Sequence, residues 1–174
     1  APKRSLTATS PSPRIYNIPA DVLLPRKLYV FRVFVGMTSD LRLNGTYDVE
    51  IYVQQQKLIA RIAGGDRSIG SDVALELDGS ASLDPDDPDG LLTPTIKMMY
   101  RWSCVNYTTS TPCKCQIAWG NRNNATTTIP AGNLTIGRYK FVLDVSKTNS
   151  SSNFIRHMND SVIIQVKGGN IPKV

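Results

Sequence analysis

The fold of this chain is decided by one stretch, Ile62–Cys104, which reads IAGGDRSIGSDVALELDGSASLDPDDPDGLLTPTIKMMYRWSC. From Val73 to Leu77 every second residue is a large apolar one, which is the period-2 pattern of a half-buried strand. The pattern returns from Met98 to Cys104, with Trp102 on the apolar face. Between them lies a loop rich in Asp, Ser and Gly, whose short side chains bond nearby backbone. Two such strands predict an antiparallel β-sandwich with Trp102 in its core.

Alternating apolar residues predict further strands on both sides of this stretch. These strands lie at Lys27–Val35, Tyr47–Val53, Gln116–Trp119, Ala125–Ile129, Ile136–Asp144 and Ser161–Val166. Lys147–Asn159 is polar and predicts a hairpin loop, in which Asn153–Met158 is the one place for a turn of helix. The pattern therefore predicts an all-β chain with immunoglobulin-like or fibronectin-III-like sandwich architecture.

The composition divides the chain into four parts. Residues 1–13 are rich in Ser, Thr and Pro and predict an extended linker. Residues 14–56 predict part of one sandwich, residues 57–168 a complete one, and residues 169–174 the start of another linker. Such a sandwich needs about seven strands. Because the first part supplies only two or three, either its domain is incomplete here or its strands join the second sandwich.

Four motifs carry a resemblance to a known family. They are LDGSASLDPD at 77–86, YRWSC at 100–104, GRYKFVLDVS at 137–146 and SVIIQV at 161–166. In this order and spacing they resemble the polycystic kidney disease (PKD) domain and the receptor-for-egg-jelly (REJ) module of polycystin-like proteins. The resemblance covers about residues 57–168. The cysteine after the tryptophan of the second motif favours the REJ type.

The resemblance implies a non-catalytic segment of a large cell-surface glycoprotein, used in adhesion, ligand sensing or force transmission, in some cases on cilia. Its expected partners are other domains of the same chain and a protein or glycan ligand at the cell surface. Side-by-side strands resist extension because many backbone hydrogen bonds must break together, and a disulfide limits how far the chain can unravel.

Charge and hydropathy limit the cellular locations and the kinds of partner that are compatible with this sequence. The chain has 174 residues, 41% of them hydrophobic, and no apolar run near the roughly 20 residues that span a bilayer. No initiator methionine or signal-like segment opens it, so we expect a mature or excised piece whose membrane anchor lies elsewhere. The net charge of +6 comes from Lys and Arg that are scattered almost singly, which indicates a solvated surface and no nucleic-acid partner.

Glycosylation acceptors indicate secretion. Six N-x-S/T sequons occur, where chance predicts about two. Their asparagines are Asn44, Asn106, Asn124, Asn133, Asn149 and Asn159. Several fall in predicted turns or strand ends, where a bulky glycan fits. We therefore expect glycans at some of these sites, although a surface rich in Ser, Thr and Asn can also form sequons by accident.

The three cysteines are Cys104, Cys113 and Cys115. In extended backbone the last two would lie roughly 6.5–7 Å apart on one face, an uncomfortable spacing for a bond between them. Cys104 is therefore expected to pair with Cys113 or Cys115, and the third cysteine to be free or paired outside this segment. The sole histidine, His157, is far off in sequence, so a zinc site is disfavoured.

The loop that begins at Asp84 holds the only dense cluster of like charge. Ca²⁺ prefers several carboxylate oxygens on a flexible loop. The candidate ligands are Asp84, Asp86, Asp87 and Asp89. The spacing does not match an EF-hand, and the alternative is a solvated turn in which Asp78 and Asp84 bond backbone amides. No other cofactor is expected.

Catalysis is not expected. His157 is the only histidine, and neither serine-containing loop shows the Gly-x-Ser-x-Gly elbow of a nucleophile. Asp48 and Glu50 could pair as glycosidase carboxylates, but alternation places them on an outward strand face. Tyr139 stands where a sandwich could use a tyrosine corner, with its hydroxyl bonded to nearby backbone, or it is simply half-buried in a strand.

Two alternative functions remain open at this point. One is an accessory carbohydrate- or matrix-binding module of PKD type on a secreted hydrolase, for which exposed aromatic residues such as Tyr52, Tyr107 and Trp119 would speak. The other is a structural linker made rigid by calcium. The preferred interpretation is an extracellular segment of a cell-surface glycoprotein, in some cases on the ciliary membrane.

Overall fold

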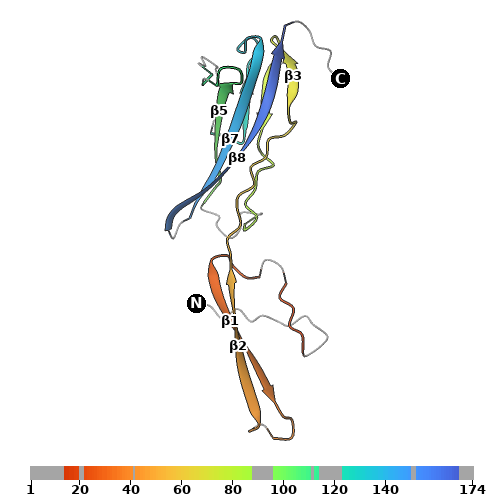
Figure 1. Cartoon of the computed structure of the whole chain (residues 1–174), viewed down its shortest axis with the longest axis vertical. Coiled ribbons are helices and arrows are strands. Elements are labelled where there is room, and N and C mark those ends of the chain that lie inside the picture. The colour runs from red at the N-terminus through yellow and green to blue at the C-terminus, as the bar shows by residue number, and fades with distance from the viewer. Residues whose placement is uncertain are drawn as a thin grey trace. The chain divides into compact units, whose positions relative to one another are not determined.

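A computed structural model describes residues 14–19, 22–40, 42–87, 96–110, 112–113, 123–149 and 152–168. These residues form strands, turns and irregular segments, and no helix among them could cross a membrane. The strands are β1 (Lys27–Gly36), β2 (Asn44–Val53), β3 (Arg67–Gly70), β4 (Leu75–Asp78), β5 (Met99–Asn106), β6 (Thr126–Ile129), β7 (Gly137–Asn149) and β8 (Ser152–Lys167). The chain forms two compact units, Ala1–Gln56 and Lys57–Val174, which are described separately (Figure 1).

The first unit contains one long hairpin. Strands β1 and β2 pair antiparallel from Lys27 opposite Val53 to Gly36 opposite Asn44. Across the hairpin, the Arg32 guanidinium donates two hydrogen bonds to the Asp48 carboxylate, at 2.7 and 2.8 Å. The strands predicted at the start of the chain are thus confirmed, but most of their apolar side chains are exposed to solvent.

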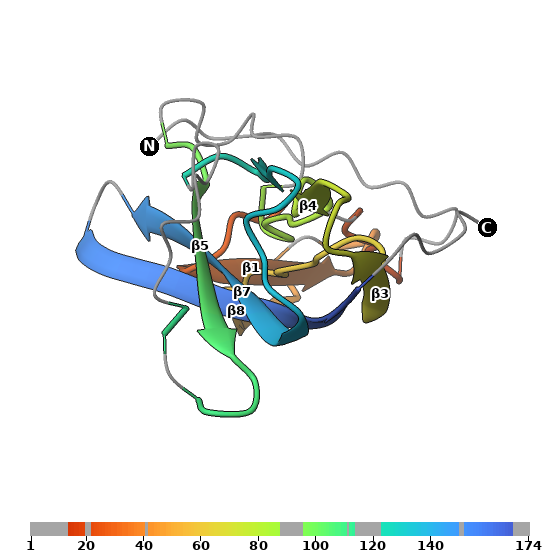
Figure 2. The same cartoon turned by 90° about the horizontal axis from the view of Figure 1, so that it is seen from above.

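The second unit is a sandwich of two sheets. One sheet has the strand order β3-β8-β7-β5, and the other pairs β4 with β6 (Figures 1 and 2). All pairs are antiparallel except β3–β8, which is parallel. The all-β sandwich is therefore confirmed, with one parallel pair where the alternation had suggested antiparallel pairing throughout.

One hydrophobic core lies between the two sheets. It is built from the inward positions of β4, β5, β6, β7 and β8, where burial alternates along each strand. Its largest fully buried side chains are Trp102, Phe141, Leu75, Leu77, Ile129, Leu143, Ile164, Val145, Val162 and Val166. The Trp102 indole is 1% exposed, and its Nε1–H donates to the backbone oxygen of Asn124 at 3.0 Å.

The predicted hairpin loop at Lys147–Asn159 is wrong. Strand β7 continues to Asn149 and β8 begins at Ser152, so most of this segment is paired strand, and the turn of helix proposed at Asn153–Met158 is absent. The alternation of inward and outward side chains simply continues past Val145, but its inward positions become polar. The strand predicted at Gln116–Trp119 lies outside the described residues.

Candidate functional site

The Asp-Gly-Ser motif and the tryptophan motif meet in the core. A Cβ atom at Gly79 would meet the Leu143 side chain and would lie 3.2 Å from both the Trp102 ring and the Ala125 backbone oxygen. The Gly79 N–H donates to that same Ala125 oxygen at 2.8 Å. Only glycine therefore lets this loop lie directly against Trp102, which explains why the two motifs occur together.

Short polar side chains hold the loop after β4. Asp78 accepts a hydrogen bond from the Ser80 N–H at 2.8 Å. Hydrogen bonds from the Ser80 hydroxyl and, to a smaller extent, from this N–H lower the pKa of Asp78. Ser82 Oγ accepts from the Arg61 N–H at 3.0 Å. Beyond it, Leu83 and Ile59 exchange two backbone hydrogen bonds of 2.9 Å. The loop is thereby fixed to the segment that leads into β3.

The acidic loop turns inward, which corrects the expectation of a solvated turn. Asp84 is 4% exposed and Asp87 is 7% exposed. The Lys147 ammonium, 5% exposed, donates to Asp87 Oδ2 at 3.0 Å and forms an ion pair with Asp84 Oδ2 at 3.0 Å. As the sequence allowed, Asp84 also accepts a backbone hydrogen bond, from the Asp86 N–H at 3.1 Å.

Arg156 completes this cluster from the neighbouring strand. It lies directly opposite Lys147 in the β7–β8 pairing, so both cations point to the same inner face. Its guanidinium donates to both Asp84 oxygens, at 2.6 and 2.9 Å, and to Asp86 at 3.2 Å. We call Asp84, Asp86, Asp87, Lys147 and Arg156 the ionic cluster. It closes one end of the core with three negative and two positive charges.

The ionic cluster keeps Asp84 ionised. Burial alone would raise the pKa of Asp84, but hydrogen bonds from Arg156 and Lys147 together outweigh it, so the pKa lies below its ordinary value. Removing one member of a buried ion pair typically costs about 3–5 kcal/mol, because it leaves an uncompensated charge. This part of the site is therefore structural, and sequence reasoning missed Lys147 and Arg156 entirely.

The carboxylates proposed for calcium face protein cations in this fold. Asp84, Asp86 and Asp87 direct their oxygens to Lys147 and Arg156, while Asp89 lies outside the described residues. Among the described residues no group of three or more His, Cys, Asp or Glu side chains is arranged to hold a metal ion. Calcium at this loop stays a prediction, and it would have to displace both cations.

A second pair of aspartates binds backbone N–H groups. Asp160 accepts from the Ile62 N–H at 2.8 Å, and Asp66 accepts from the Ile163 N–H at 2.7 Å. Strand β3 then runs parallel to β8, and the Ser71 N–H donates to the Lys167 oxygen at 3.0 Å. Residues 62–71 are therefore joined to residues 160–167 at Ile62 and from Asp66 to Ser71, and we call these connections the parallel seam. Nothing in the spacing of these aspartates identified it from the sequence.

The predicted disulfide is present and joins Cys104 to Cys113, with 5.5 Å between their Cα atoms. Cys104 belongs to the buried core and Cys113 packs against it. The two cysteines are nine residues apart in sequence. Closing a loop of this length should raise the free energy of unfolding by about 2–3 kcal/mol, because it lowers the conformational entropy of the unfolded chain. Cys115 lies outside the described residues.

Tyr139 is 7% exposed and its hydroxyl is bonded. It donates to the Thr135 backbone oxygen at 3.0 Å and lies 2.8 Å from Thr135 Oγ1. A buried phenol that returns to the backbone a few residues upstream is the arrangement of a tyrosine corner. It fixes the turn that leads into β7.

Most sequon asparagines are accessible. Asn44, Asn124, Asn133 and Asn159 are exposed. Asn106 is half-buried, and its Oδ1 accepts from the Thr108 and Thr109 N–H groups at 3.0 and 3.2 Å. Asn149 ends β7, and its side chain is outside the described set.

The residues considered for catalysis or sugar binding are dispersed. Asp48 is paired with Arg32 in the first unit, and Glu50 is exposed on the same hairpin. His157 lies in β8 of the second unit and is exposed. Of the aromatic residues, Tyr52 and Tyr107 belong to different units, and Trp119 is outside the described residues.

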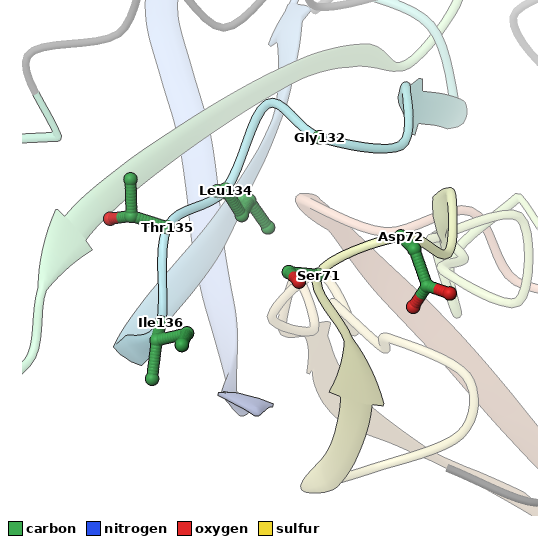
Figure 3. Close-up of a pocket in the computed structure, with 6 residues that line it drawn as sticks. All are labelled: Ser71, Asp72, Gly132, Leu134, Thr135 and Ile136. Carbon is green, nitrogen blue, oxygen red and sulfur yellow. The ribbon is translucent and has the colours of Figure 1, made fainter. Parts of the chain in front are cut away.

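A surface depression lies between two loops of the second unit (Figure 3). Its lining residues are Ser71, Asp72, Gly132, Leu134, Thr135 and Ile136. The loops are joined by the Gly132 N–H, which donates to the Ser71 oxygen at 2.8 Å. Asp72 is the only titratable side chain in the lining, so the depression offers no acid–base pair.

Comparison with known proteins decides the family. Residues 3–174 match the REJ domain. The chain belongs to the REJ domain family. The match includes the first unit as well as the second, and it confirms the REJ part of the resemblance, which had been placed at about residues 57–168.

A curated relative of this REJ domain is human polycystin-1, which is 34% identical over 153 residues. That alignment covers 87% of the chain but only 3% of polycystin-1, so the chain spans a small part of that protein. Among solved structures, a nucleoside hydrolase-related hypothetical protein from Saccharophagus degradans gives a TM-score of 0.48 at 16% identity, covering 66% of this chain and 26% of its own. A likeness this weak carries no argument about function.

Proposed function

We propose that this REJ domain is a non-catalytic, load-bearing module in the extracellular part of a large polycystin-like glycoprotein. The parallel seam is the observation that carries the proposal. It joins the segment near the start of the second unit to the last strand of that unit. The module would hold the neighbouring domains of the same chain and a surface ligand at set distances. This role would serve adhesion or ligand sensing at the cell surface, including the surface of cilia.

The direction of the seam determines how it responds to tension. When the two ends of the second unit are pulled apart, β3 and β8 are drawn in opposite directions along their own axes. Because the strands are parallel, the bonds of the seam are loaded together in shear rather than opened one after another. The carboxylates of Asp66 and Asp160 lengthen the seam beyond the four backbone register pairs of β3 and β8.

The disulfide and the sequons support the extracellular compartment. Structural disulfides persist in oxidising compartments and are rare in the cytosol. Cys104–Cys113 ties β5 to the loop that follows it, so the residues between the two cysteines cannot extend under force while the bond is intact. If the module is secreted, glycosidase treatment of the protein from mammalian cells should lower its mass. An unchanged mass would speak against this compartment.

Single-molecule pulling tests the load-bearing role. The chain is placed between reference domains and stretched, first as wild type and then as Asp66→Ala/Asp160→Ala. We expect the double variant to unfold at a clearly lower force, while Asp144→Ala, on the outer face of β7, keeps the wild-type force. Reduction should add about 30 Å of contour length, from nine residues at about 3.6 Å each. Equal forces for wild type and double variant would refute the proposal.

We further propose that residues 14–56 are the terminal strands of a second sandwich. Their hairpin exposes apolar residues such as Val35 and Tyr47, at 67% and 73%. A two-stranded hairpin is marginally stable by itself and needs more strands or a second layer. If strands elsewhere in a longer protein supply that layer, hydrogen exchange of β1 and β2 should slow in a longer fragment and be fast in this one.

A further inference from the structure

The outer face of the four-stranded sheet carries an imbalance of charge. Outward positions of β5, β7 and β8 hold one acid, Asp144, which lies directly opposite Arg101. Beyond this pair the same face holds Arg138, Lys140 and Lys167 with no acid between them. We call these last three residues the basic row.

The basic row differs from the cations on the inner face of the same strands. Lys147 is buried and Arg156 is half-buried, and both are paired with aspartates. Within the described part of the chain, no member of the basic row forms an ion pair. Its positive charge is therefore directed to solvent.

Strand register sets the spacing of the row. Arg138 and Lys140 are two positions apart on β7, and Lys167 lies diagonal to Arg138 on the neighbouring strand. These relations correspond to roughly 6.5–7 Å along the strand and about 7–8 Å on the diagonal. The Arg138 guanidinium also lies 4.5 Å from the centroid of the Tyr107 ring, which orients it. The row is an oblique line of three charges on the outer face of the sheet.

Most acids of the second unit occur in one segment of the sequence. The segment from residue 66 to residue 89 contains eight Asp or Glu and a single cation, Arg67. Of these acids, Asp84, Asp86 and Asp87 form ion pairs within the ionic cluster. The outward positions of β5, β7 and β8 therefore carry more positive than negative charge, although the sequence shows only scattered Lys and Arg.

We propose that the basic row binds a sulfated glycosaminoglycan chain. The inference rests on the extracellular location in the proposed function, which removes nucleic acid as the natural polyanion. An open sheet face with charges in a line suits an extended linear polymer, because such a ligand needs no pocket and its affinity arises from repeated charge neutralisation. The proposal names the glycan class of partner for this module.

Heparin, a highly sulfated probe, tests the proposal on the whole chain secreted from mammalian cells and treated with glycosidase, since Asn159 lies on the same face. We expect Arg138→Gln/Lys140→Gln/Lys167→Gln to weaken binding at least tenfold. The slope of log K against log salt should fall by about two to three. The control Lys27→Gln/Lys57→Gln/Arg61→Gln removes three exposed cations elsewhere and should change binding less than twofold.

Four outcomes would overturn the proposal. They are no binding of heparin by the wild type, equal losses in the two triple variants, equal binding of unsulfated hyaluronan, and equal binding of polyglutamate, which would indicate an acidic protein partner. A charge-conserving variant, Arg138→Lys/Lys140→Arg/Lys167→Arg, should retain binding and shows that folding is intact. The Asp66→Ala/Asp160→Ala variant should bind heparin normally while losing unfolding force, so the two proposals fail separately.

Discussion

The hairpins β1–β2 and β7–β8 are built from similar residues but differ in what covers them. In the first, Val35 is 67% exposed and Tyr47 is 73% exposed. In the second, Phe141 and Leu143 are 0% exposed because the β4–β6 sheet faces them across the core. Strand pairing satisfies backbone hydrogen bonds in both, yet only a second layer removes apolar side chains from water.

This difference predicts where stability resides. Free energy of unfolding should be concentrated in the second unit, where apolar area is buried, and mutations in the first unit should have small effects on it. The four predictions that follow each set a residue in the sandwich against a counterpart outside its core.

The largest effect is expected for Trp102→Ala. The indole is almost fully buried and donates a hydrogen bond, so its loss should lower the free energy of unfolding by about 3–5 kcal/mol. Tyr47→Ala, an aromatic truncation on the exposed hairpin, should cost less than about 1 kcal/mol. Urea titration followed by tryptophan-independent circular dichroism measures both. Equal costs would show that the contrast in burial has no energetic meaning.

The second largest effect is expected for Lys147→Ala, which should lower the free energy of unfolding by about 3 kcal/mol, because it leaves Asp84 and Asp87 buried with less compensating charge. Lys140→Ala, on the outer face of the same strand, should cost less than about 0.5 kcal/mol. The same titrations with calcium or a chelator test the metal hypothesis. Stabilisation of wild type by calcium would mean that the loop can exchange its protein cations for a metal.

Acid should weaken the two units differently. The pKa of Asp84 is lowered in the folded state, so its contribution is complete above the unfolded value of about 3.9 and is lost as pH falls through the folded pKa. Asp48 also has a lowered pKa, through hydrogen bonds from Arg32, but both groups are exposed. Added salt should therefore reduce the acid sensitivity due to Asp48 and leave that of Asp84.

Unfolding measured between pH 6 and pH 2, at low and high salt, separates these contributions. Asp84→Asn should flatten the acid limb for the second unit, because its cost is largest near pH 6 and shrinks as wild-type Asp84 becomes protonated. An acid limb in Asp84→Asn as steep as that of wild type would assign the effect to another carboxylate.

The smallest effect is expected at Thr127. Its hydroxyl is buried, and it is the one buried side-chain polar atom without a hydrogen-bond partner among the described residues. Thr127→Val keeps the shape and removes the unsatisfied group, so it should be neutral or stabilise by up to about 1 kcal/mol. Thr46→Val, on the exposed hairpin, should be within about 0.5 kcal/mol of wild type. A clear loss in Thr127→Val would indicate a bound water at this hydroxyl.

Period-2 alternation was sufficient to predict the sandwich because its apolar residues, such as Leu75 and Leu143, follow the pleat. It failed at Lys147 and Arg156, since a charged residue at an inward position has the same appearance in sequence as one in a solvated loop. The pairing that buries them depends on aspartates at least 60 residues away. The parallel β3–β8 pair was missed for a similar reason, because four residues of strand give too short a pattern to reveal a direction.

Thr135 has two roles with a practical consequence. Its hydroxyl completes the Asn133 sequon, and the same hydroxyl contacts the phenol of Tyr139. The substitution Thr135→Ala would therefore abolish glycosylation at Asn133 and also disturb the turn that leads into β7. Asn133→Gln removes the acceptor amide and leaves that contact in place, so a defect in secretion shared by both variants can be assigned to the missing carbohydrate. A defect confined to Thr135→Ala belongs to the turn itself.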